Sequence, residues 1–200
     1  MPAEQRFWTR RAAALAGLVV VALGTPACND PPANEPIVTG ASEPGFAEQA
    51  AAVRQGRSEQ IRLDHTSVRD EQLDDLDGLE DKLRRINLSH SDITDAGLER
   101  IARMRKLIQL RLASDRVTDA GLACLEELKE LRHLHLIDAP ITDAGLEHLH
   151  ALEGLESLYL DGIRATDEGI SRLVEALPGV HLHIDGGHHR VDPHANDHEH

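Results

Sequence analysis

The feature that most constrains the fold of this chain is a repeat of about 24 residues. Each copy begins with a short run in which leucine or isoleucine alternates with other residues, and most copies continue with a segment close to Ile-Thr-Asp-Ala-Gly-Leu. The central apolar residue of the run is Ile61, Ile86, Leu110, Leu134, Leu158 and Leu182 in successive copies. Subtracting consecutive numbers gives steps of 25, 24, 24, 24 and 24 residues. Such regular spacing predicts a stack of equivalent structural units.

Each copy is predicted to fold as a strand, a turn and a helix. Alternation places the leucines of a run on one face of a strand, and downstream residues such as Leu98, Ile101 and Met104 recur at helical spacing. One unit cannot bury its own apolar stripe, whereas stacked units share a continuous core. Aromatic residues make up only 2% of the chain, so this core must consist of Leu, Ile and Val. We therefore predict an α/β solenoid with a parallel sheet on the concave face and helices on the convex face.

The start of each predicted helix carries a Thr-Asp pair. A threonine hydroxyl can cap backbone N–H groups, and a following carboxylate favours the positive end of the helix. The aspartates recur with the repeat, at Asp95, Asp119, Asp143 and Asp167. We interpret them as capping residues rather than as a ladder of calcium ligands. The glycines two residues later are expected to let each helix approach its neighbour closely.

Two motifs resemble a known family. The Leu-x-x-Leu-x-Leu run followed by an amphipathic segment resembles the leucine-rich repeat, and Ile-Thr-Asp-Ala-Gly-Leu resembles the subclass found in many planctomycete and related bacterial envelope proteins. The resemblance covers roughly residues 60–186. The usual Asn or Cys after the strand is replaced by Thr66, Ser91, Asp115, Ala139 and Ile163. The resemblance implies a binding or scaffolding module.

The first residues have the pattern of a targeting segment. Three arginines precede an apolar run over residues 12–23, which is too short for a membrane-spanning helix because such a helix needs about 20 apolar residues. Residues 1–28 are therefore predicted to be a signal peptide. Its end resembles a bacterial lipobox, which makes Cys28 the candidate for lipidation and anchoring in the cell envelope or periplasm. Simple cleavage and secretion are the alternative, because Thr25 and Pro26 depart from the usual lipobox.

The remaining segments differ in composition. Residues 29–44 are rich in Pro, Asn, Glu, Ala and Ser and lack apolar periodicity, which predicts a flexible tether. Residues 45–57 carry apolar residues at helical spacing and are predicted to form an N-terminal capping helix. The repeat domain is expected over residues 58–186. Residues 187–200 are predicted to be a disordered, His-rich tail.

Charge and motif content exclude two classes of function. The formal net charge is −14, whereas a nucleic-acid-binding protein needs a basic surface to neutralise phosphates, so no nucleic-acid partner is predicted. The sequence has no Gly-rich phosphate loop, paired zinc motif or dinucleotide fingerprint. The run Ser89-His90-Ser91-Asp92 cannot converge into a nucleophile, a base and an orienting group, because its residues are consecutive. The chain is therefore not predicted to be an enzyme.

The candidate binding site lies on the predicted concave face. The residues flanking the central apolar residue of each strand point outward, and none of these twelve is acidic in a chain with 35 Asp and Glu residues. The candidate ligand-binding residues are Arg62, Arg85, Asn87, Gln109, Arg111, His133, His135, Tyr159, His181 and His183. Among them, one continuous row is expected from Arg62, Arg85, Arg111, His135, Tyr159 and His183. Such donors suit a protein or another anionic surface polymer. Alternatively, they merely keep the sheet soluble.

The C-terminal tail supplies a second candidate site. Its histidines are His188, His189, His194, His198 and His200. Neutral imidazole is a good ligand for zinc, nickel and copper, and short His-rich tracts bind such ions weakly without a fold. No cofactor is predicted beyond weak zinc or nickel binding by this tail. A metal-handling envelope protein, in which the tail is the active element, is the alternative function.

Overall fold

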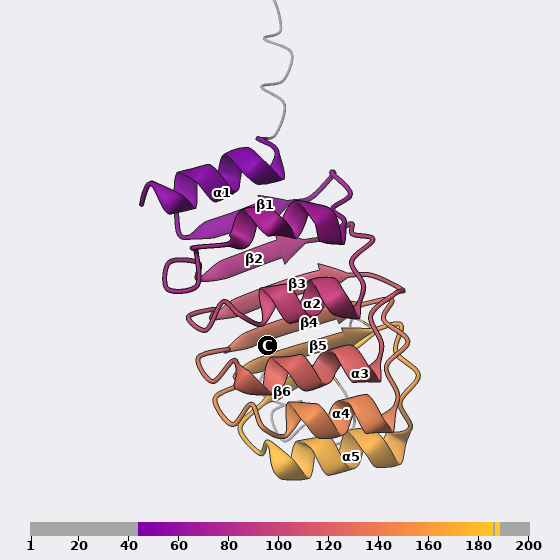
Figure 1. Ribbon diagram of the computed structural model, residues 1–200. Coiled ribbons are helices and arrows are strands. Elements are labelled where there is room, and N and C mark those ends of the chain that lie inside the picture. Colours follow the sequence, from indigo (N-terminus) through magenta and orange to yellow (C-terminus); the bar gives the residue numbers. More distant parts are fainter. Residues whose placement is uncertain (1–43, 186, 189–200) are drawn as a thin grey trace, which may run out of the picture. The chain divides into compact units, whose positions relative to one another are not determined.

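The computed structural model describes residues 44–185 and 187–188 (Figure 1). The predicted signal peptide with Cys28, and all of the predicted tether except its last residue, lie outside the described residues. Four of the five predicted metal-binding histidines also lie outside them, namely His189, His194, His198 and His200. The described residues thus comprise the predicted capping helix, nearly all of the repeat domain and the first two residues of the predicted tail.

The sheet has the topology that the repeat predicts. Its repeat strands are β1 (Gln60–Leu63), β2 (Arg85–Leu88), β3 (Gln109–Ala113), β4 (His133–Ile137), β5 (Ser157–Asp161) and β6 (His181–Ile184). They lie in sequence order, and each is parallel to the next. The register pairs Ile86 with Ile61 on one side and with Leu110 on the other, so equivalent residues of successive repeats stand side by side. The predicted parallel sheet is confirmed.

Helices cover one face of this sheet (Figure 1). They are α1 (Phe46–Arg54), the 3-10 helix η1 (Asp70–Leu76), α2 (Asp95–Ile101), α3 (Asp119–Leu122), the 3-10 helix η2 (Ala123–Glu127), α4 (Asp143–Leu149) and α5 (Asp167–Ala176). A threonine hydroxyl accepts a hydrogen bond from the first turn of α2, α4 and α5. The N-cap residues of η1 and α3, Arg69 and Thr118, lack this bond. The 3-10 segments thus occur in the two repeats that lack a hydroxyl cap.

The core is a continuous stack of aliphatic side chains. Leu134 and Leu136 of β4 are 1% and 0% exposed, and the inward residues of the other repeat strands are buried in the same way, except that Ile184 of β6 is only partly buried. Beside the first strand, α1 contacts β1 and η1 and buries Phe46, Ala50 and Val53. The predicted leucine-rich-repeat solenoid is therefore the fold of the described residues.

An Asp–Thr ladder links the helix starts of successive repeats. Asp95 accepts hydrogen bonds from the backbone N–H and the hydroxyl of Thr118 in the next repeat, both at 2.8 Å. The equivalent pairs are Asp70–Thr94, Asp119–Thr142 and Asp143–Thr166. The interpretation that each aspartate serves its own helix was therefore incomplete, because the carboxylate bridges two repeats.

The ladder also explains the glycine of the motif. A Cβ atom at Gly121 would lie 2.3 Å from Oδ1 of Asp95, which is far closer than two such atoms can approach. The corresponding position of the first repeat is Gln72, and no earlier repeat places an aspartate beside it. The glycine thus makes room for the carboxylate of the preceding repeat rather than for the helix as a whole.

The C-terminal end departs from the prediction. Gly187 and His188, which the sequence assigned to a disordered tail, form β7 (Gly187–His188) and pair with β6 in the antiparallel direction. Asp185 has a φ of 48°, in the left-handed region that suits a tight reversal of the chain. His188, a predicted metal ligand, therefore stands opposite His183 in the sheet.

Candidate functional site

The face of the sheet opposite the helices, here called the open face, carries the candidate binding residues. Along β4 the inward side chains are buried, whereas His133 is exposed and His135 is half-buried. Arg62 and Arg85 are exposed, and Asn87, Gln109, Arg111, Tyr159, His181 and His183 are half-buried. The candidate residues therefore all point away from the core.

The candidate residues form two rows rather than one. In the downstream row, adjacent strands pair Arg62, Asn87, Arg111, His135, Tyr159 and His183. In the upstream row they pair Gln60, Arg85, Gln109, His133, Ser157 and His181. The predicted single row that included Arg85 is wrong, because Arg85 precedes the central Ile86 of its strand whereas Arg62 comes after Ile61. Asn87 is the true neighbour of Arg62.

Acidic residues border the downstream row. Arg62 Nε lies 2.6 Å from Oδ2 of Asp64, and the Asn87 amide donates to Oδ1 of the same carboxylate at 3.1 Å. His135 Nε2 lies 2.7 Å from Oδ2 of Asp161. The twelve predicted positions thus remain free of acidic residues, but Asp64 and Asp161 follow them at β1 and β5, where β2, β3 and β4 have Ser89, Ala113 and Ile137. The signal that was missed is the aspartate two positions after the outward residue.

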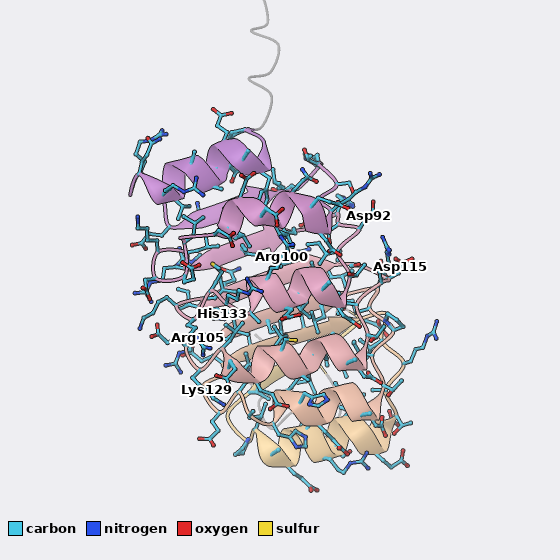
Figure 2. All side chains as sticks on the ribbon, viewed as in Figure 1. Asp92, Arg100, Arg105, Asp115, Lys129 and His133 are labelled. Carbon is cyan, nitrogen blue, oxygen red and sulfur yellow. The ribbon has the colours of Figure 1, made fainter. Side chains whose placement is uncertain are left out.

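Charged side chains project from the loops at both ends of the strands (Figure 2). Asp92 and Asp115 project from the edge at which the strands end, and Arg105 and Lys129 project from the opposite edge. Partners of opposite charge lie beside some of them, since Arg105 pairs with Glu127 and Asp92 pairs with Arg69.

Three rings lie side by side across the strands on the downstream row, with one pair tilted by 38° and the other stacked. The ring centroids of His135 and Tyr159 are 5.0 Å apart, and those of Tyr159 and His183 are 4.3 Å apart with nearly parallel planes. Stacking of this kind holds side chains in one geometry. The downstream row thus presents a preformed surface on β4 to β6.

A hollow of about 410 Å³ lies beside this stack, over β3 to β5. Its polar lining consists of Gln109, Arg111, His133, His135, Ser157 and Tyr159, five of which are predicted site residues. None of the lining residues from the described part of the chain is acidic. Nε of Arg111 is buried and has no hydrogen-bond partner within the described part of the chain. Arg85 lies apart from this group and lines a second hollow of about 420 Å³ with residues 56–60.

Neither a metal cluster nor a membrane span is visible in the described part of the chain. No group of three or more His, Cys, Asp or Glu residues in residues 44–185 and 187–188 could hold a metal ion. None of the helices there is long and apolar enough to cross a bilayer.

Comparison with family models identifies one repeat of the chain. A family model described as "Leucine Rich repeat" matches residues 82–102, which contain β2 and α2. The fold is a leucine-rich-repeat solenoid. No curated protein matches the sequence. One matching solved structure is an internalin (inlF) from Listeria monocytogenes, at 19% identity and a TM-score of 0.35. The match covers 57% of this chain and 45% of the internalin chain.

Proposed function

We propose that the repeat domain is a binding module that recognises another protein through the open face of its sheet. The observation that carries this proposal is the hollow beside the stacked rings of His135, Tyr159 and His183. Tyrosine and arginine are among the residue types that contribute most to binding at protein interfaces, above all where neighbouring groups exclude water. Here Tyr159 and Arg111 lie in one preformed depression.

A protein is favoured over an anionic surface polymer as the partner. Asp64 and Asp161 border the open face, and the chain carries a formal net charge of −14. A polyanion would be repelled by these charges, whereas a protein surface can present both signs in register.

The proposed role is non-catalytic. Among the consecutive residues Ser89 to Asp92, the Ser89 hydroxyl donates to Asn87 Oδ1 at 2.7 Å, and the Ser91 hydroxyl donates to the Ala113 carbonyl at 2.8 Å. Neither hydroxyl is thus directed at His90, as a nucleophile paired with a base would be. Attachment to the cell envelope through Cys28 is part of the same proposal and rests on the sequence alone.

Site-specific photocrosslinking tests the choice of face. The full chain would carry p-benzoylphenylalanine at His133 on the open face or, as the matched control, at the exposed Glu147 on α4. We expect an adduct of defined mass from position 133 in the producing cells, none from position 147, and loss of the adduct when excess unmodified chain competes. An adduct from position 147 without one from position 133 would contradict the proposal.

A further inference from the structure

Arg111 differs from the other arginines on the open face. Arg62 is paired with Asp64, and Arg85 is exposed to solvent. Arg111 is half-buried, and its Nε is buried without a hydrogen-bond partner among the described residues. A buried donor without an acceptor is rare in proteins because its lost hydration is not replaced. The guanidinium of Arg111 therefore retains capacity for an acceptor that the described residues do not supply.

The surroundings of Arg111 fit an anionic acceptor. None of the described residues that line the hollow carries a carboxylate, and Asp161 is already paired with His135. Gln109 and Ser157 add uncharged groups that can donate hydrogen bonds, and the ring of His133 also lines the hollow. The hollow therefore combines one permanent positive charge with several further polar groups.

The same features select the class of anion. The planar fork of a guanidinium matches the two oxygens of a carboxylate. A single arginine balances one negative charge, and the acidic body of the protein opposes a group that carries two, such as phosphate. The Tyr159 ring in the wall offers contact to the methylene groups beside a carboxylate.

We propose that this hollow is a carboxylate-binding site, in which Arg111 receives an aspartate, a glutamate or the C-terminal carboxylate of a partner protein. This inference rests on the proposed function, because it names the chemical group that the open face recognises. The site spans three repeats, since its lining residues come from β3, β4 and β5.

Nuclear magnetic resonance on the full chain tests the site directly. The Nε–H signal of Arg111 would be monitored during titration with N-acetyl-glutamate α-amide, which has a side-chain carboxylate, and with N-acetyl-alanine, which has a C-terminal carboxylate. N-acetyl-glutamine α-amide is the neutral control, and inorganic phosphate is the competing anion. We expect saturable shifts with one or both carboxylates, and the stronger of the two identifies the source. No saturable shift is expected with the glutamine probe or with phosphate.

Variants separate this site from general charge attraction. Arg111→Met should abolish saturable binding, and Arg111→Lys, which keeps the charge but loses the fork, should weaken it by about tenfold. Arg103→Met removes an exposed arginine that follows α2, outside the open face, and should leave binding unchanged. Circular dichroism confirms that each variant is folded.

Several outcomes would overturn the inference. Equal binding of the carboxylate probes by folded Arg111→Met or Arg111→Lys would do so, as would equal binding of the glutamine probe or tighter binding of phosphate. If the titrations give one of these outcomes but crosslinking from position 133 succeeds, the carboxylate site is refuted and the proposed function stands. If crosslinking comes from position 147 instead, the proposed function is lost whatever the titrations show.

Discussion

The Asp–Thr ladder predicts that Asp95 and Gly121 are strongly coupled. Asp95→Ala removes two hydrogen bonds to Thr118. Hydrogen bonds to charged groups contribute about 1.5–3 kcal/mol each. Because Thr118 is exposed and water can replace part of what is lost, we expect Asp95→Ala to lower the free energy of unfolding by about 2–3 kcal/mol.

Gly121→Ala should also destabilise, although the same change usually stabilises a helix by about 0.5–1 kcal/mol. The added Cβ would lie 2.3 Å from Oδ1 and 2.9 Å from Cγ of Asp95. The carboxylate cannot swing away without breaking its bonds to Thr118, so we expect a cost of about 1–3 kcal/mol, as in other overpacked sites.

The double variant Asp95→Ala/Gly121→Ala tests whether the two positions are coupled. Once Asp95 is alanine, the nearest remaining atom is its Cα at 3.3 Å, so Gly121→Ala should become neutral or slightly stabilising. The coupling energy from urea unfolding should then be about 2 kcal/mol. Gly179→Ala, where a Cβ would meet nothing within 4 Å, is the control. Additivity of the two changes within about 0.5 kcal/mol would refute the reasoning.

Other parts of the chain yield four further predictions. Leu134, which is 1% exposed, should lose about 2–5 kcal/mol of unfolding free energy when changed to Ala, and urea unfolding that changes by less than about 0.5 kcal/mol would contradict its inward position. Hydrogen bonds from Thr166 lower the pKa of Asp143 below its usual value of 3.8. The ionised carboxylate should therefore stabilise the fold above pH 3.8, and this stabilisation should be lost as pH falls through the lowered pKa. In thermal melts, Asp143→Asn should make the melting temperature fall less steeply with acidification. Cys28→Ser should release the chain from membranes in a fractionation assay, and a variant that stays membrane-bound would argue against lipidation. Removing residues 189–200 should abolish micromolar zinc binding in calorimetry, and unchanged binding would move the site to the histidines of the open face.

The fold could be predicted because the repeat period is visible in the positions of individual leucine residues. The spacing from Leu110 to Leu134 and Leu158 equals the step between paired residues in adjacent strands, so the parallel register could be read directly. The two-residue alternation also placed each outward side chain on the correct face.

What could not be predicted depends on contacts between repeats. Asp95 looked like a helix-capping residue because its partner, Thr118, lies 23 residues away. The pairing of His135 with Asp161 spans 26 residues and was missed for the same reason. The assignment of Arg85 to the wrong row has a different cause. The residues of that row were grouped by charge rather than by their position relative to the central apolar residue. The alternation of apolar and polar residues could not reveal the hollow either. The volume of the hollow depends on the packing of long side chains from three strands.

The short strand β7 fixes how far the sheet can extend. A parallel stack that ended at β6 would leave its last row of N–H and C=O groups open, and another chain could add a strand there. Because β7 runs in the opposite direction, the next strand outward would not meet the parallel hydrogen-bonding pattern that joins β1 to β6. β7 covers His183 and Ile184 at this edge, and α1 packs against β1 at the other end. Both features oppose the addition of a further parallel repeat, so the length of the open face is determined within one chain.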